Sequence, residues 1–260
     1  MNKYLVGTLA AASMAASMII GAGTAMAQAA EVKEKPPMYS YLANWNVPRA
    51  QWAEMEKSNA NAEKVTASAL AKGTLVGYGN DMTIVHTEEG YTHDDWWSSM
   101  SMAGVMNVLD EMFKSGNATS SALESATRHS DGIYVSRHYN WHPGTYTGAY
   151  TRIAAYKLKA DAPDDAVEVL SKSFIVPTLE KLLADGTIVE YEIDVEAIHT
   201  ASPDMFFIDV IARNAEGLDK LNAALADSIK SNPLAGQAFG SMVDSSAHRD
   251  GLMRSNVTYK

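Results

Sequence analysis

Two patterns of hydrophobic and polar positions alternate along this chain. Apolar residues at every second position predict strands, and apolar residues three or four positions apart predict helices. The clearest strand is 187–199, in which Val189, Tyr191 and Ile193 alternate with acidic residues. The clearest helix precedes it over 163–185 and is followed at once by a glycine, which is typical of a helix C-terminus.

These patterns predict the order strand, helix, strand, strand, helix, strand, followed by the same order again. In the first half the elements are 39–47, 48–72, 74–86, 91–99, 104–129 and 133–139. In the second half they are 151–160, 163–185, 187–199, 205–213, a helix from 218 that is interrupted at Pro233, and 252–259. The Asp-Gly pairs at 131–132 and 250–251 predict turns before the two final strands, so the histidines ahead of them, His129 and His248, are read as structural.

The two halves also match in sequence. The segment Gly73–Tyr78 (GTLVGY) is repeated as Gly186–Tyr191 (GTIVEY). The matches continue at the same spacing with Asp81 and Asp194, His86 and His199, and Gly104 and Gly217. A register that holds across a helix, two strands and the next helix indicates a duplication.

The predicted fold class is α+β, with two tandem βαββαβ ferredoxin-like repeats packed sheet-to-sheet as one α/β barrel. Each repeat covers one sheet face with its helices, and packing the two open faces together buries both. The expected organisation is a signal peptide (1–27), a linker (28–37), a first repeat (38–140), a connector (141–150) and a second repeat (151–260).

This topology and its duplication resemble the dimeric α/β-barrel superfamily in its fused, single-chain form. The resemblance covers nearly the whole mature chain and rests on topology rather than on a signature motif. It implies a ligand or an active site between the two sheets. The superfamily includes cofactor-free monooxygenases, isomerases, and haem proteins such as chlorite dismutases and dye-decolorising peroxidases.

The N-terminus is predicted to direct export. Lys3 is followed by an apolar run over Leu5–Ile20, and Ala25–Ala27 has the A-x-A pattern of a cleavage site. The mature protein is therefore expected in the periplasm or outside the cell, with no membrane association after cleavage. The chain has no cysteine, which excludes a lipoprotein anchor, disulfides, thiolate metal sites and cysteine nucleophiles. The formal charge is −10, and −11 once Lys3 is removed, which argues against nucleic acids and anionic membranes as partners.

Four acidic residues alternate along one predicted strand, namely Glu190, Glu192, Asp194 and Glu196. If they face the barrel interior, at least one has a raised pKa, which favours a general acid/base or a cation site. If their face is wet instead, Lys157 and Lys159 of the neighbouring strand are their partners. Glu192 and Asp194 are the candidate ligand-binding residues among these four acids.

Residues that occur in only one repeat are the stronger functional candidates. The first repeat has His93–Trp97 (HDDWW) where the second has Phe206–Ile208. It also has Ser136–His142 (SRHYNWH) where the second has Ser255–Val257. Such aromatic, basic and acidic groups suit a flat organic ligand. The alternative is an aromatic-rich rim that packs against the connector.

These candidates have assigned roles in the leading hypothesis. His138 or His93 moves a proton, and Arg137 holds an anionic oxygen of the substrate. The residues that contact the ligand are Trp96, Trp97, Ser136, Asn140 and the repeated pair Tyr78 and Tyr191, although repetition also suits a structural role for that pair. No cofactor is predicted, because no metalloprotease, serine-hydrolase, phosphate-binding or haem-peroxidase motif occurs. If haem or a divalent cation is found, His86, His138 and His199 are the ligands to test.

Three classes of function remain open. The first is an exported barrel that binds a small organic molecule and acts on it by cofactor-free acid/base chemistry, like a monooxygenase or an isomerase. The second is a non-enzymatic envelope or stress protein that works by self-association into a homo-oligomer. The third is a haem- or metal-binding barrel.

Overall fold

The computed structural model describes residues 32–85, 90–199 and 204–260. The predicted signal peptide, residues 1–27, and His86 lie outside the described residues. The first repeat consists of β1 (Met38–Asn46), η1 (Arg49–Gln51), α1 (Trp52–Ala71), β2 (Gly77–Thr83), β3 (His93–Ser99), α2 (Met102–Lys114), η2 (Asn117–Thr119), α3 (Ser121–Glu124) and β4 (Arg128–Trp141). The second repeat consists of β5 (Gly144–Leu158), α4 (Ala166–Leu170), the π-helical turn η3 (Ser171–Ile175), α5 (Val176–Ala184), β6 (Ile188–Glu196), β7 (Met205–Ala212), α6 (Ala215–Ser231), α7 (Pro233–Met242) and β8 (Val243–Tyr259).

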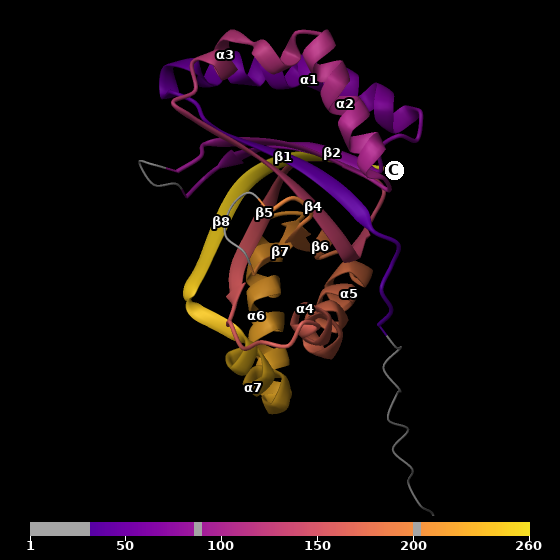
Figure 1. The fold of residues 1–260 in the computed structure, drawn as a ribbon, viewed down its shortest axis with the longest axis vertical. Helices are drawn as coiled ribbons and strands as arrows, with labels where there is room; N and C mark the ends of the chain where they lie inside the picture. Colours follow the sequence, from indigo (N-terminus) through magenta and orange to yellow (C-terminus); the bar gives the residue numbers. More distant parts are fainter. Residues whose placement is uncertain (1–31, 86–89, 200–203) are drawn as a thin grey trace, which may run out of the picture. The chain divides into compact units, whose positions relative to one another are not determined.

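The eight strands form one closed barrel in the order β1-β3-β2-β8-β5-β7-β6-β4. Each repeat contributes four neighbouring strands, and antiparallel pairing of β2 with β8 and of β4 with β6 joins the two sheets at both edges. Figure 1 shows α1, α2 and α3 on one side of the barrel and α4 to α7 on the other. The predicted α+β fold of two tandem repeats in one barrel is confirmed. Closure by hydrogen bonds at both edges leaves the barrel without a free strand edge.

The two repeats have the same local structure where their helices end and begin. Gly73 and Gly186 each follow a helix and each have a φ of 75°, a backbone conformation that favours glycine. The amides of Gly104 and Gly217 are bonded to the side chains that cap α2 and α6. The register found in the sequence therefore reflects equivalent structural positions.

Some predicted boundaries differ from the structure. The segment 141–150, expected as a connector, lies mostly in β4 and β5, and only residues 142 and 143 separate the two strands. The Asp-Gly pairs at 131–132 and 250–251 lie inside β4 and β8 rather than in turns. Local turn preference is overridden here because these long strands pair along their length with β1 and β5.

The main apolar core lies between the sheets and the helices. In the second repeat the core is built around fully buried side chains of α4, α5 and β7, including Leu170, Leu179 and Phe206. In the first repeat it includes Leu75 and Val105. Burying such a side chain contributes roughly 1.5–3 kcal/mol. Among the described residues, no helix is both long enough and apolar enough to span a membrane.

The acidic strand β6 shows which face of the sheet points inward. Tyr191 and Ile193 belong to the helix-side core, so the acidic residues that alternate with them point into the barrel. Glu190 and Glu192 are buried there, with exposed fractions of 1% and 6%. The interpretation in which these acids face the barrel interior is therefore confirmed. The alternative of a wet face paired with lysines is wrong, because barrel closure encloses this face.

Candidate functional site

Cavities lie on both faces of the first sheet. The first, called the helix-side pocket here, has a volume of about 270 Å³ and lies between the sheet and α1, α2 and α3. Its lining comprises Tyr41, Ala43 and Trp45 of β1, Asp95 and Trp97 of β3, His129 and Asp131 of β4, and Ser58, Asn59, Ala62, Leu109, Met112, Phe113, Asn117, Ala118 and Leu123 of the helical layer. The second cavity is the barrel interior.

The sheet wall of the helix-side pocket is made of aromatic pairs. Tyr41 and Trp97 stack with ring centroids 4.5 Å apart. Trp45 and His129 stack at 3.6 Å, nearly parallel to each other. The indole of Trp97 is held in place because its Nε1 donates a hydrogen bond of 3.1 Å to the carbonyl of Val105. The wall therefore presents rigid, flat surfaces to a ligand.

Polar groups converge on this aromatic wall. The hydroxyl of Tyr41 donates to Asp131 over 2.5 Å, and Nε2 of His129 lies 3.1 Å from the same carboxylate. Asp95 lies between these aromatic pairs on β3, opposite Ala43 of β1. Burial raises the pKa of Asp95 to about 7, with the charges of Asp81 and Glu56 adding to the effect. A carboxyl group with such a pKa is suited to both accepting and donating a proton near neutral pH.

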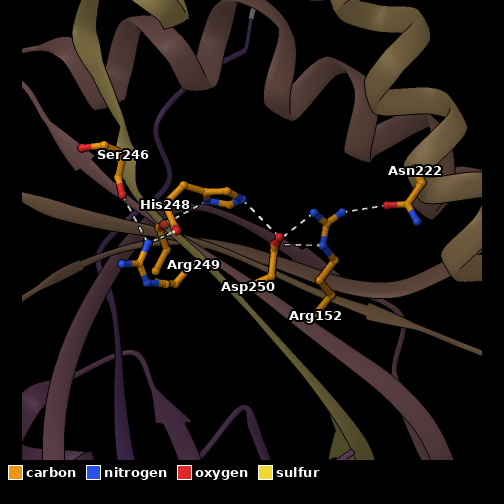
Figure 2. A network of polar contacts seen from close by, with 7 residues as sticks. Arg152, Asn222, Ser246, His248, Arg249 and Asp250 are labelled. Atoms are coloured by element: carbon orange, nitrogen blue, oxygen red, sulfur yellow. Dashed lines mark hydrogen bonds and ion pairs between the residues drawn. The ribbon is translucent and has the colours of Figure 1, made fainter. Parts of the chain in front are cut away.

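The second repeat retains part of this arrangement and replaces the rest. His248 and Asp250 are the repeat equivalents of His129 and Asp131, and Nε2 of His248 lies 3.1 Å from the Asp250 carboxylate (Figure 2). Arg152 stands where the first repeat has Tyr41; its guanidinium donates to Asp250 at 3.0 and 3.2 Å and to Asn222 at 2.8 Å.

The remaining second-repeat counterparts are apolar. Ile208 pairs with Ala154 as Asp95 pairs with Ala43, so the proton-carrying group is present in one repeat only. Phe239 of α7 packs edge-on against Tyr156 with ring centroids 5.1 Å apart. The repeats therefore share the His-Asp pair, whereas the carboxyl group in an open cavity belongs to the first.

The barrel interior has a different character. Its central cavity, of about 50 Å³, is lined by acids from three strands together with Trp96, Tyr134 and Tyr259. A wider cavity of about 380 Å³ leads from there to one end of the barrel. The acids that line one or both cavities are Asp81, Asp94, Glu190, Glu192, Asp194, Asp209 and the exposed Asp250.

Several solved structures have a fold similar to that of this chain. The chain is similar to a protein named as a candidate monooxygenase from Lactobacillus acidophilus, with a TM-score of 0.62, 11% identity, and coverage of 86% of this chain and 97% of that one. It is also similar to an anthrone oxidase-like protein (TM-score 0.53, 11% identity, 87% and 94% covered). A third similar structure is a mutant chlorite dismutase from Candidatus Nitrospira defluvii (TM-score 0.50, 11% identity, 85% and 92% covered).

This chain has the fused dimeric α/β-barrel fold. At such low sequence identities the likeness concerns the fold alone. No family model matches the sequence, and no curated protein matches it. Within the fused barrel, function must therefore be argued from the residues of the cavities.

The predicted residues of β3 lie on opposite faces of the sheet. Trp97 lines the helix-side pocket and Trp96 lines the barrel interior, where its Nε1 donates to Asp81 over 3.1 Å. His93 is buried on the helix side, edge-on to Trp52, and burial lowers its pKa to about 4. His93 is thus a neutral core residue at neutral pH.

The predicted residues of β4 lie beneath the helices of the second repeat. A register shift at Ser136 turns the following residues, so that His138 and Asn140 face α4 and α5. Nε2 of His138 lies 3.0 Å from Glu168, and Asn140 donates to Glu180 at 3.0 Å. The structure therefore does not bring these residues together with Trp96 or Trp97.

The remaining predicted residues are distributed as follows. Ser136 is buried and bonds to the backbone carbonyls of His138 and Ile193. Arg137 is exposed, 3.9 Å from Glu34. The hydroxyls of Tyr78 and Tyr191 bond to helix carboxylates, at 3.3 Å to Glu63 and at 2.5 Å to Glu180. Glu192 and Asp194 are the predicted ligand-binding residues that line the barrel interior.

Sequence reasoning missed several residues of both cavities. Asp95 lies inside the HDDWW segment, but that segment did not show which of its acids would face a helix-side pocket. The sequence predicts a turn at Asp131 and a structural role for His129 ahead of it, although both residues recur as Asp250 and His248. The acids missed in the interior are Asp94 and Asp209, each of which is replaced by an aromatic residue in the other repeat.

Among the described residues, the histidines predicted as haem or metal ligands do not form such a site. His138 already bonds to Glu168, and both ring nitrogens of His129 are engaged. His199 is exposed at the end of β6 and lines neither of the two cavities. Within residues 32–85, 90–199 and 204–260, no three His, Asp or Glu side chains converge to hold a metal ion.

Proposed function

We propose that the protein binds a small, flat, largely apolar organic molecule in the helix-side pocket and acts on it by acid/base chemistry. The observation that carries this proposal is the carboxyl group of Asp95, which borders an aromatic-walled cavity of about 270 Å³. Ligand sites in proteins are usually apolar cavities with a few convergent polar groups, and this pocket has that composition. The names of similar structures, which include a candidate monooxygenase and an anthrone oxidase-like protein, are consistent with an organic ligand of this class.

The chemistry follows from the positions of the polar groups. Tyr41 and Trp97 hold a flat ring against the sheet, and Asp95 accepts a proton from an acidic carbon or hydroxyl group of that ring. His129 and Asp131 line the pocket with partly exposed side chains, so this pair is the proposed route for the proton between the pocket and solvent. Removal of a proton next to a carbonyl group is the first step of both isomerisation and cofactor-free oxygenation, so this step is the proposed core activity.

A direct test is hydrogen–deuterium exchange at the carbon next to the carbonyl of 2-tetralone, a flat bicyclic ketone, followed by proton NMR in D₂O. We expect the protein to accelerate exchange above the buffer rate. Asp95→Asn should reduce the protein-dependent rate by about 10²-fold or more, the usual contribution of a general base. The control Asp110→Asn, on the exposed part of α2, should leave the rate unchanged.

A second variant tests the cavity rather than the base. Ala62 lines the pocket from α1, and Ala62→Phe places a ring in the cavity. This variant should abolish both exchange and binding of 2-tetralone while the fold, followed by circular dichroism, is retained. Exchange that equals the buffer rate, or that survives in Asp95→Asn, would refute the proposal.

We also propose export of the protein, supported by the apolar run after Lys3 and the Ala25–Ala27 pattern. Mass spectrometry of protein isolated from the producing cells should give an N-terminus at Gln28. An intact Met1 on the folded protein would contradict this.

Self-association stays a prediction, for which exposed apolar side chains such as Phe113 and Leu234 are the surface to examine.

A further inference from the structure

The inner face of the barrel carries an unusual number of acids for an enclosed space. They come from four strands, and six of them are at least nine-tenths buried. These six are Asp81, Asp94, Glu190, Glu192, Asp194 and Glu196, and Asp209 joins them as a partly exposed seventh. Carboxylates are rarely buried without a partner because desolvation of a charge is costly.

Several of these carboxyl groups have one oxygen without a hydrogen-bond partner. Asp81, Glu190 and Asp194 line the central cavity, and each has one buried oxygen without a hydrogen bond. Asp94 and Asp209 also each have one such oxygen, and both line the wider cavity. The unpaired oxygens are buried acceptors of residues that line the cavities, so a donor that reaches them would satisfy them.

Arg249 is the single lysine or arginine that lines these cavities among the described residues. Its Nη1 donates to the backbone carbonyls of His248 at 2.6 Å and of Ser246 at 3.3 Å, as Figure 2 shows. The guanidinium is exposed and held against its own strand at the rim. It is therefore not bonded to the deep acids.

The shape of the space indicates which donor fits. The wider cavity of about 380 Å³ has apolar walls that include Leu42, Phe207 and Met253. Asp94, Asp194 and Asp209 line it as well, and Asp194 and Asp209 continue into the central cavity. A ligand that matches both regions has an apolar body in the wider cavity and a positively charged end in the acidic part.

A metal ion does not match this arrangement as well. Ca²⁺ requires six or more oxygens at 2.3–2.6 Å, and the described acidic side chains include no group of three that converges in this way. An alkylammonium group needs three acceptors at ordinary hydrogen-bond distances, which is a looser requirement. We propose that the barrel interior is a second binding site, distinct from the helix-side pocket, for a primary alkylamine in its ammonium form.

The raised pKa values of the interior carboxyl groups support this site. Burial raises the pKa of Asp81 and of Asp194 to about 7, and burial together with neighbouring carboxylates raises the pKa of Glu190 and Asp209 well above the usual range. An ammonium group would remove this penalty by replacing the bound protons. The titratable groups that line the two cavities are Asp81 of β2, Tyr91 ahead of β3, Asp94 of β3, Tyr134 of β4, Glu190, Glu192 and Asp194 of β6, Asp209 of β7, and Arg249, Asp250 and Tyr259 of β8. The described interior-facing residues of β1 and β5 that line these cavities are not ionisable.

The test is calorimetric titration of the full mature chain with hexylamine at pH 7, with hexan-1-ol and CaCl₂ as comparison ligands. We expect hexylamine to bind and the neutral alcohol of the same length to bind at least tenfold more weakly. Binding should release protons, so the measured heat should vary with the ionisation enthalpy of the buffer. The affinity should rise from pH 6 to pH 8 as the carboxyl groups become available.

Two variants locate the site. Asp94→Asn and Asp209→Asn preserve side-chain shape and should each weaken hexylamine binding about tenfold or more, as expected for loss of a charge-assisted hydrogen bond. Asp227→Asn, on the exposed face of α6, should change it less than twofold. Because the variants relieve repulsion, they should raise the melting temperature without ligand, which separates lost binding from lost folding. Equal binding of hexan-1-ol, binding of Ca²⁺ without hexylamine, or unaltered affinity in both variants would overturn the proposal.

Discussion

Asp94 and Asp95 are adjacent in β3, yet their carboxyl groups lie on opposite faces of the sheet. Asp94 lines the barrel interior, and Asp95 lines the pocket beneath α1 and α2. The reason is the two-residue period of a strand, which directs neighbouring side chains to opposite faces. One dipeptide thus supplies an acid to each of two cavities, and substitutions at the two positions should separate the two proposed activities.

The first prediction concerns the pH dependence of stability between pH 6.5 and 8.5. Asp81 and Asp194 have pKa values raised by burial to about 7, against about 3.9 in an unfolded chain. The native state therefore holds protons that the unfolded state has lost. The resulting stability is fully present below pH ~4 and is lost as the pH rises through about 7. Urea unfolding should show a fall of at least about 1.4 kcal/mol across this window, the value of one pKa unit.

The control for this experiment is the double variant Asp81→Asn/Asp194→Asn, which should show a weaker dependence. His93 acts in the opposite direction, because burial lowers its pKa to about 4. Its contribution changes only below its unfolded value of about 6.5, outside the chosen window. A free energy of unfolding that stayed constant or rose between pH 6.5 and 8.5 would show that the interior acids are not protonated on folding.

The second prediction concerns the space for Trp96 inside the barrel. A Cβ at Gly79 would lie 2.7 Å from the indole ring of Trp96. Gly79→Ala should therefore destabilise the protein by about 1–3 kcal/mol, the usual cost of overpacking. Gly240 of α7 is the matched control, because a Cβ there has no atom within 4 Å and alanine favours the helix by about 0.5–1 kcal/mol. Chemical denaturation of both variants should give changes of opposite sign, and equal changes would argue against this packing.

The third prediction is that His138 contributes to the stability of the protein and not to its activity. This side chain has an exposed fraction of 5%, and its Nε2 lies 3.0 Å from Glu168. Burial works against ionisation of Glu168, but hydrogen bonds from Lys172 and His138 outweigh it and lower its pKa to about 2. His138→Ala should cost about 1.5–3 kcal/mol, the contribution of a hydrogen bond to a charged group.

The matched variant is Arg137→Ala, at an exposed residue, which should change the free energy of unfolding by less than about 0.5 kcal/mol. Neither variant should alter the rate of 2-tetralone exchange. Loss of exchange in His138→Ala with unchanged stability would restore the sequence-based assignment of this histidine as the proton carrier.

The sequence by itself determined the repeat, the order of the elements and the barrel. The reason is that hydrophobic periodicity and the helix-ending glycines at 73 and 186 are local signals that survive in the folded chain. It also indicated that the first repeat is chemically distinct, since Asp95 and Trp97 come from its unmatched HDDWW segment.

Only the tertiary structure decided which residues meet. The register shift at Ser136 turns His138 and Asn140 toward α4 and α5, and no pattern in the sequence marks such a shift. Closure of the barrel encloses the acids of β6 and adds Asp94 and Asp209 from other strands. Both outcomes depend on pairing between strands that are distant in the chain, and that pairing sets the face and neighbours of each side chain.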